Sequence, residues 1–430
     1  MTLLFSGNVS SNAQEKWDLP MCIRQALKSN SEIKRQQVQV DKQTIQVQTH
    51  QYSRLPNLMA GGTQKIDFGR SLNRENTYDD INSQSSNFSL STEIPLFTGF
   101  NISNLIAQHK LELKVYSENL EKTENDIALR VATFYYQVLL YKEIVSITSK
   151  QIELSKELKD ITQILANNGK VPGSQVLEVQ AQLSDDELRA VMAQNTAHLA
   201  VIDLIQLMEL PDPESFDIIP IQEDSILPLL GQPKDIYSMA QQMMPEIRST
   251  SYAIERNKKA VKVAESGYYP TLTLAAEMNS GYYHFSNSSN QTFNDQMKNN
   301  LQKTIYLTLR IPLFNRLSTR NSVRSAKKEL EDSYLIAENA HKTLYKTIQK
   351  AYYDAISARK KYVSTQQAAV ANQEALRYAQ EKYNAGKSNA YEFNEAKMKL
   401  ANSLSEQAQA KYEFLLQKYQ LDFYAGKAIK

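Results

Sequence analysis

The same local pattern occurs twice in this chain of 430 residues. An apolar, strand-like segment ends in Ile-Pro-Leu-Phe at residues 94–97 and again at 311–314, an offset of 311 − 94 = 217. The same offset relates Gly169 to Gly386. An internal repeat of this kind predicts two structural copies of one unit. Each copy alternates long helical segments with short strands, and few architectures require that order.

Two segments contain almost no proline or glycine, which predicts unusually long helices. In the first, apolar residues recur at alternating spacings of four and three, a pattern typical of a coiled-coil seam. These residues are Ile127, Val131, Phe134, Val138, Tyr141 and Val145. We expect helices over about residues 98–166 and 318–384. At ~1.5 Å per residue each would be roughly 100 Å long.

Each copy also contains two helical segments of about half that length. We expect them over about residues 20–52 and 172–209 in the first copy, and 235–267 and 388–424 in the second. The simplest packing places two short helices end to end beside one long helix. A coiled-coil wall of this kind has no compact core, so it would have to associate with copies of itself.

Four segments between the helices alternate apolar and polar residues with a period of two, which predicts strands. They cover about residues 55–68, 87–97, 269–284 and 304–314, and we interpret them as two hairpins with long polar loops. The pattern fits either a half-buried soluble sheet or strands that face lipid, since about 9–11 residues can span a membrane. Four strands cannot close a barrel, so lipid-facing strands would require an oligomer.

The chain is thus mainly α-helical with candidate membrane β-strands. Residues 17–210 form the first repeat and residues 235–430 the second, joined by a proline-rich linker over 211–234. Residues 1–16 contain a short apolar run followed by small residues, which is typical of the tail of a secretory signal. A disordered cytosolic leader is the alternative.

Composition argues against several classes of function. Lys and Arg together number 49, and Asp and Glu 47, so charge gives no reason to expect binding to nucleic acid. No run of about 18 apolar residues predicts a membrane helix. The five histidines are scattered and none has a second ligand at metal-binding spacing. We expect no metal site, no cofactor and no catalytic constellation.

Cys22 is the only cysteine, which excludes an intramolecular disulfide. It could be a lipidated N-terminal cysteine or a thiol on the core-facing side of a helix. Pro20 and Met21 stand where small residues would precede a lipidated cysteine. The core-facing position is therefore favoured.

These features together resemble the TolC-like outer membrane efflux protein family over essentially the whole chain. The resemblance rests on the duplicated strand-to-helix junctions and on two helix-to-helix turns at one common offset. The matching residues are Pro95, Phe97, Pro312 and Phe314 at the junctions, and Gly169, Ser174, Tyr383, Gly386 and Ser388 at the turns.

The resemblance implies a fold, a location and partners. Three chains would form a ring, in which twelve strands build one barrel through the outer membrane and the helices build a coiled-coil α-barrel across the periplasm. Family members are passive exit ducts that dock an inner-membrane transporter through a periplasmic adaptor. The alternative is a periplasmic coiled-coil adaptor or a structural interaction protein, for which the duplicated amphipathic strands would be unexplained.

The resemblance also implies a constriction. In the family, inward carboxylates narrow the periplasmic end six and nine residues after the turn glycine, which here gives Glu392 and Glu395. This spacing places both on one helix face. Six carboxylates from three copies would attract cations. The alternative is that both are solvated helix residues paired with Lys397 or Lys399.

Contacts between the two turns can latch the closed state in the family, and the matching residues here are Ser174, Gln175, Tyr383 and Ser388. Gln175 and Ser388 stand where family members have an acid and an arginine. We therefore expect a hydrogen-bonded contact through Tyr383 rather than a salt bridge.

The tips of the turns, at Gly169 and Gly386, would contact the adaptor, or they are simple turns without a binding role. At the other end of the helices, Phe97, Phe100 and Phe314 would form an aromatic belt at a membrane interface. Ordinary packing at a strand–helix junction is the alternative.

Overall fold

The computed structural model describes residues 16–72, 76–80, 82–211, 216–220, 231–286 and 289–427. These residues form two compact units. The helical unit comprises the chain up to Val38, Glu118–Arg248 and Glu338–Lys430, and the sheet unit comprises Gln39–Ser117 and Ser249–Ala337. Neither unit coincides with one sequence repeat, because each combines segments of both. The predicted leader and most of the predicted linker lie outside the described residues.

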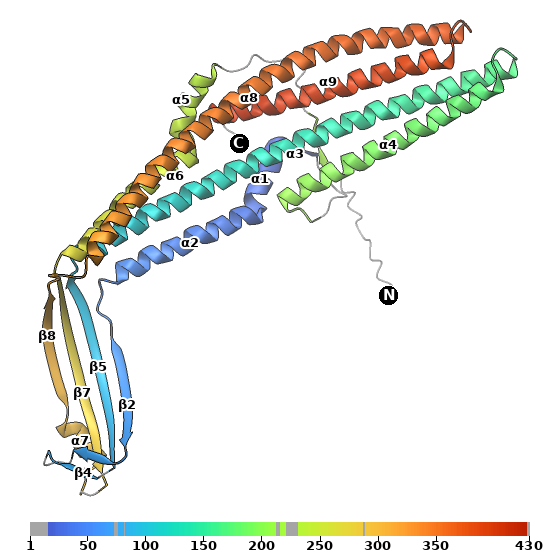
Figure 1. The fold of residues 1–430 in the computed structure, drawn as a ribbon. Coiled ribbons are helices and arrows are strands. Elements are labelled where there is room, and N and C mark those ends of the chain that lie inside the picture. The colour runs from blue at the N-terminus through green and yellow to red at the C-terminus, as the bar shows by residue number, and fades with distance from the viewer. Residues whose placement is uncertain are drawn as a thin grey trace, which may run out of the picture. The chain divides into compact units, whose positions relative to one another are not determined.

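The long helices follow their predicted ranges closely. Helices α3 (Asn101–Asn167) and α8 (Ser318–Asn384) have 67 residues each (Figure 1). The shorter helices α4 (Gly173–Met208) and α9 (Ala390–Tyr424) belong to the helical unit. Among the described residues, no helix combines the length and the apolarity needed to cross a bilayer.

The other two short helices were predicted to be continuous, which was wrong. The segment 20–52 consists of α1 (Leu19–Ser29) and α2 (Ser31–Tyr52), because the side chain of Asn30 accepts hydrogen bonds from the backbone of Glu32 and Ile33 and so caps a new helix.

The segment 235–267 consists of α5 (Pro233–Met243), α6 (Pro245–Glu265) and a 3₁₀ turn, Ser266–Tyr268. Pro245 cannot donate a backbone hydrogen bond inside a helix, but it is well suited to the first position of α6.

Four strands form one antiparallel sheet in the order β2-β5-β7-β8. Their bounds are Met59–Asp67 for β2, Ser83–Phe97 for β5, Thr271–Phe285 for β7 and Gln302–Arg310 for β8. The two predicted hairpins are thus joined through the central pair β5–β7. The prediction that residues 55–58 and 311–314 belong to strands was wrong, so Pro312 and Phe314 follow β8 rather than end it.

Pro95, by contrast, lies within β5. It pairs with Thr273 of β7, and the register shifts between Pro95 and Phe97. Proline cannot donate to a sheet ladder. It is tolerated here because the pairing of β5 with β2 extends only from Ser83 to Ser91, so no β2 strand residue needs its missing N–H.

Segments predicted as polar loops contain structure of their own. A short pair of strands, β3 (Arg70–Leu72) and β4 (Tyr78–Asp80), follows β2, and helix α7 (Phe293–Asn299) precedes β8. Alternation of apolar residues cannot reveal a helix of seven residues, because it has fewer than two full turns.

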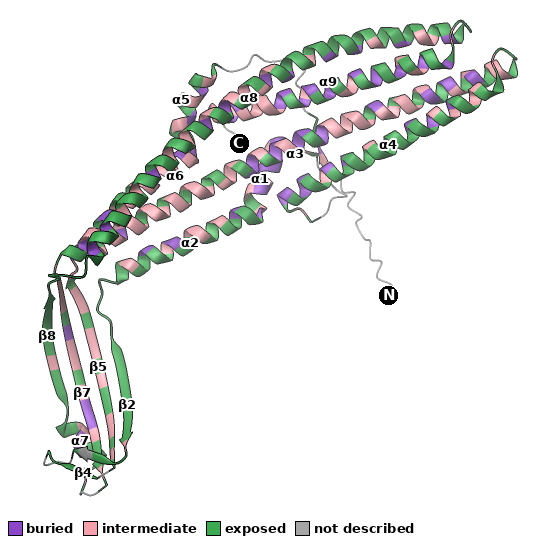
Figure 2. Cartoon of the chain, viewed as in Figure 1, coloured by how far each residue is buried: buried purple, intermediate pink, exposed green. Residues whose placement is uncertain are grey.

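The helical unit is held together by several small apolar clusters along its helices rather than by one compact core. In the largest cluster, Cys22 and Val131 are completely buried, together with Tyr135 at 1% exposure. Burial raises the pKa of the Cys22 thiol to about 12. Cys22 therefore occupies the core-facing position that the sequence favoured. Figure 2 shows that α8, in contrast, is mostly exposed.

The Tyr135 hydroxyl fixes the short parallel pair of β1 (Lys16–Trp17) and β6 (Asp217–Ile218) at this cluster, donating to the carbonyl of Ile219 at 2.6 Å.

Each strand–helix junction contains two consecutive residues with left-handed backbone. They are Gly99 (φ 60°) and Phe100 (φ 66°) in the first repeat, and Arg316 (φ 55°) and Leu317 (φ 61°) in the second. The offset is again 217 (316 − 99), so the backbone of the junction is duplicated although the residues are not.

We expect Gly99→Ala to destabilise the protein. A Cβ at this position would lie 2.7 Å from Cβ of Tyr269 and 2.8 Å from the carbonyl oxygen of Ser266, in a backbone conformation that disfavours side chains. Such strain costs about 1–3 kcal/mol, measurable as a lower melting temperature of the purified protein. Gly173→Ala, where a Cβ meets nothing within 4 Å, is the matched control. Equal melting temperatures for the two variants would contradict this account.

Candidate functional site

The two helix-to-helix turns end α3 and α8 in the same way. Gly169 (φ 70°) and Gly386 (φ 67°) are left-handed, and the next residues donate backbone hydrogen bonds back into the helix, from Lys170 to Leu165 and from Lys387 to Lys382, at 2.9 Å each. This is a common way to end a helix, with a left-handed glycine just after its last turn. A Cβ at either glycine would meet nothing within 4 Å, so glycine is needed for its backbone conformation alone.

Helix α9 begins with a capped first turn that contains Glu392, and Glu395 follows in the second turn. The Asn389 side chain accepts from the backbone of Glu392 at 2.9 Å, and the Ser388 hydroxyl donates to the Glu392 carboxylate at 2.7 Å. Glu395 forms an ion pair with Lys399 at 2.7 Å. Glu392 and Glu395 are both exposed on the same side of the helix.

Lys397 is not available to either carboxylate. Its side chain has no exposed surface, and its ammonium group lies 2.5 Å from the carboxylate of Asp186 on α4, whose side chain is 2% exposed. Lys397 also donates to the hydroxyl of Ser155 on α3, which in turn donates to Asp186 at 2.6 Å. Of the two partners named in the alternative interpretation, Lys399 pairs with Glu395, whereas Lys397 pairs with neither carboxylate.

This buried network joins three helices through one ammonium group. Gln182 donates to the second carboxylate oxygen of Asp186 at 3.3 Å, so both oxygens have partners. A buried charge is tolerated only when it is paired and hydrogen-bonded. Lys397 therefore links α9, from the second repeat, to α3 and α4, from the first.

The sequence contains a signal for this network. On α9, Lys397 interrupts an apolar stripe that includes Phe393 and Leu400, and on α4, Asp186 interrupts one that includes Leu183 and Ala190. One cation and one anion at core positions of two helices indicate a buried pair. The sequence alone could not indicate which helices face each other.

Tyr383 also links the two repeats. Its buried hydroxyl lies 2.6 Å from that of Thr162 on α3, within an apolar cluster that includes Leu158 and Phe393. The structure thus gives Tyr383 a hydrogen-bonded contact with the first repeat, but through Thr162 rather than through Ser174 or Gln175. Ser174 is exposed and Gln175 is half-buried.

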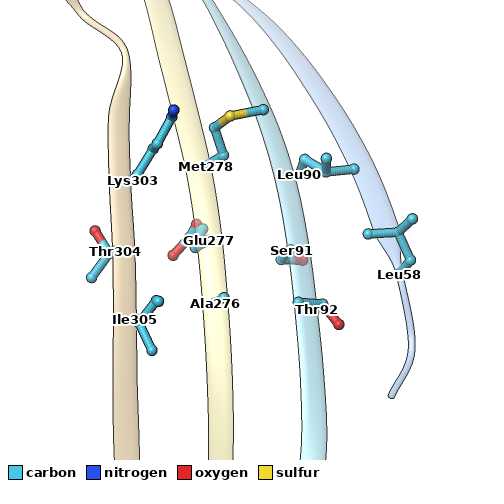
Figure 3. A pocket seen from close by; sticks show the side chains of 10 residues that line it. All are labelled: Leu58, Leu90, Ser91, Thr92, Ala276, Glu277, Met278, Lys303, Thr304 and Ile305. Atoms are coloured by element: carbon cyan, nitrogen blue, oxygen red, sulfur yellow. The ribbon is translucent and has the colours of Figure 1, made fainter. Parts of the chain in front are cut away.

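The sheet has one apolar and one polar face. Paired positions on the apolar face include Leu90 with Met278 and Leu274 with Leu307. Side chains of Leu58, Leu90, Met278 and Ile305 line a shallow hollow of about 350 Å³ on it (Figure 3). Exposed apolar side chains on this face include Ile66, Phe88, Leu90, Leu274, Met278, Ile305, Leu307 and Leu309.

The aromatic residues at the strand–helix junctions have different environments. Phe97 packs edge-on against Phe100 at 5.2 Å between ring centroids, and Phe100 packs against Tyr269 at 6.1 Å. Phe314 is 78% exposed. Phe100 is itself 58% exposed, so both junctions present an aromatic surface, and the rings of the first junction also pack against one another.

We expect Lys397→Met to destabilise the protein by about 3–5 kcal/mol, because it leaves the carboxylate of Asp186 buried without its cation. Lys397→Met combined with Asp186→Leu should recover most of that stability. Denaturation of the detergent-purified protein measures both. Lys399→Met, which removes an exposed ion pair two residues away, is the control and should have little effect. If both lysine variants behaved alike, the network would contribute no stability.

Among the described residues, no group of three or more His, Cys, Asp or Glu side chains could hold a metal ion. The geometry of the chain is instead that of long helices and an amphipathic sheet. Solved structures of outer-membrane channels share this fold. The chain aligns with the Campylobacter jejuni CmeC outer membrane channel at a TM-score of 0.78 and 17% identity, over 95% of this chain and 85% of that one. The Neisseria gonorrhoeae MtrE channel in its open state gives 0.76 and 16%, over 96% and 89%.

Sequence relatives agree. Outer membrane protein TolC of Escherichia coli (strain K12) is 22% identical over 416 residues, which are 94% of this chain and 81% of the relative. Toxin and drug export protein A of Aggregatibacter actinomycetemcomitans is 21% identical over 305 residues, 70% of this chain and 64% of that relative's length. The sequence model of one family matches residues 22–209 and 236–427, in both repeats. The chain belongs to the outer membrane efflux protein family.

Proposed function

We propose that this protein is the outer-membrane exit duct of an efflux or secretion system. Three copies form a barrel of twelve strands in the outer membrane and a tube of helices in the periplasm. The observation on which the proposal depends is the sheet unit, which combines an exposed apolar face with two edge strands. A monomer in water would leave the apolar face exposed, and a monomer in lipid would leave the backbone groups of the edge strands unpaired.

The apolar face supports contact with lipid. Ile305, Leu307 and Leu309 of β8 are between 58% and 77% exposed, and they alternate with Thr304, Tyr306 and Thr308. Alternation of apolar and polar residues along each strand is the pattern of a membrane barrel with a polar interior. A periplasmic adaptor or a structural coiled coil, the alternative function, would have no use for such a surface.

The helices support association in the same way. Helix α4 exposes a stripe of large apolar side chains, from 47% to 72% exposed, at positions close to a heptad repeat. They are Leu177, Leu188, Val191, Met192, Leu199 and Ile202. In the trimer this stripe packs against a helix of a neighbouring copy.

The helical unit also has a groove that suits a helical partner. It has a volume of about 610 Å³ and lies between α3, α8 and α9. Leu154, Leu376 and Leu404 supply apolar surface, and Lys150 and Glu374 supply charges of both signs. A coiled-coil helix binds to apolar surface that is flanked by charges. The groove therefore suits a helix of a periplasmic adaptor, which is itself docked on an inner-membrane transporter.

We assign the narrow point of the duct to Glu392 and Glu395. Both carboxylates are exposed on one side of the first turns of α9, and the hydrogen bond from Ser388 to Glu392 fixes one of them. Three copies provide six carboxylates, and such a ring favours cations. Lys399 partly neutralises Glu395, which weakens the ring but leaves Glu392 unpaired with any cation in the described residues.

The proposed function is tested by the mass and conductance of the protein extracted from membranes. We expect a trimer by light scattering in detergent, and discrete channels in planar lipid bilayers. A protein that remains monomeric and water-soluble without detergent would contradict a duct and favour the alternative.

The constriction makes a separate prediction. Glu392→Ala combined with Glu395→Ala should reduce the cation selectivity of the channels, measured as a reversal potential closer to zero in a salt gradient, and should weaken block by trivalent cations. Glu329→Ala combined with Glu331→Ala removes the same number of exposed carboxylates from α8 and is the control. Selectivity and block equal to those of the unchanged protein would disprove the ring.

A further inference from the structure

We infer that β8 of one copy pairs with β2 of the next in a single register, with Arg310 opposite Met59 and Gln302 opposite Asp67. This inference rests on the proposed trimer and specifies its seam. Both edge strands of the sheet, β2 and β8, then pair with further copies of this chain.

The two edge strands match in length and direction. Each has nine residues, Met59–Asp67 in β2 and Gln302–Arg310 in β8. They occupy opposite ends of the sheet order and run antiparallel, because three successive antiparallel pairings separate them. A ring of identical sheets therefore continues the antiparallel pattern across each seam. When β2 and β8 overlap over their full length, every residue of each strand has a residue of the other strand opposite it.

The register also preserves the two faces of the sheet. On β8, Ile305 and Leu307 lie on the apolar face, and on β2 the residues that share this face are even-numbered, since Ala60 pairs with Leu90 and Gly62 with Phe88. The inferred register places Ile305 opposite Gln64 and Leu307 opposite Gly62. A shift by one residue would exchange the faces, so alternatives differ in steps of two.

The two edges are staggered within one copy. Following the hydrogen-bonded rows of the sheet, Met59 lies in the same row as Ser91, Glu277 and Thr304. Across the seam, however, Met59 faces Arg310. Each copy therefore shifts the register by 310 − 304 = 6 residues, and this is the shear that a closed barrel requires.

The size of this stagger fits barrel closure. Six residues at ~3.3 Å advance about 20 Å along the strands for every four strands, which span about 19 Å at ~4.8 Å each. The strands would then tilt by about 45° from the barrel axis, at the upper end of the roughly 35–45° that barrels adopt. A shift of four residues gives about 35°, but it leaves two residues of each edge unpaired in lipid.

Cysteine pairs across the seam test the register. Ile305→Cys with Gln64→Cys, and Tyr306→Cys with Thr63→Cys, occupy adjacent rows of the inferred pairing. Antiparallel rows alternate between wide and close spacing, so one of the two suits a disulfide. Mild oxidation of the trimer in detergent should give covalent trimers on non-reducing gels. Cys22, which is completely buried, remains in every variant.

Matched controls keep Ile305→Cys and move its partner by two residues, to Gly62→Cys or Ile66→Cys, which report shifts of four and eight. Preferential cross-linking through Gln64 or Thr63 supports the inference. If the trimers cross-link best through the cysteine at Gly62 or at Ile66, the register is wrong but the duct is not. The same holds if the protein is a trimer and none of the cysteine pairs cross-links. A protein that is monomeric before oxidation overturns both proposals.

The unmodified protein provides a second measurement, in case the cysteines disturb assembly. Polarised infrared spectra of oriented membranes report the mean tilt of the strands. We expect about 45° from the membrane normal, and strands nearly parallel to the normal would exclude the stagger.

Discussion

The fold of the sheet unit is constrained above all by the need to satisfy every backbone hydrogen bond of β5 and β7. In lipid an unpaired N–H or carbonyl group costs several kcal/mol, so strands can cross a membrane only when no edge remains open. The central strands, with 15 residues each, are longer than the edge strands, with nine. Parts of β5 and β7 therefore extend beyond β2 and β8. The groups that hydrogen-bond to these parts determine how copies of the sheet can join.

Side-chain amides cover the outer edge of β7 where β8 is absent. Gln296 of α7 both accepts from and donates to the backbone of Tyr283, at 2.9 Å each, and Asn300 donates to the carbonyl of Gly281 at 2.6 Å. Asn290 makes the same two-way contact with Phe285, again at 2.9 Å. Along the last third of β7, these side chains supply hydrogen bonds that a neighbouring strand would otherwise supply.

Much of this architecture could be predicted from the sequence. The long helices and the existence of four strands follow from periodicity and from the absence of proline and glycine, which act locally, and the two turns follow from the glycines at the ends of the long helices. The break at Asn30 depends on a local cap, which periodicity does not register, and the hydrogen bond from its side chain to Leu207 in a distant helix could not be predicted. The Lys397–Asp186 pair is similar: the sequence marks each residue as a charge in an apolar stripe, but only packing identifies the partner. The constriction residues were located by resemblance, since nothing in their spacing distinguishes them from solvated glutamates.

The repeat explains the long strands but not the stagger between the short ones. In the first hairpin the short strand β2 pairs with Ser83–Ser91, at the loop end of β5, whereas in the second β8 pairs with Thr271–Asn279, at the helix end of β7. Two identical hairpins would place both short strands at the same end. The difference arises where the repeats differ, because α7 and its amides occupy the loop end of β7 and delay the start of β8 until Gln302. A short helix in a polar loop thus sets the offset of six residues, and with it the strand tilt at which three copies can close.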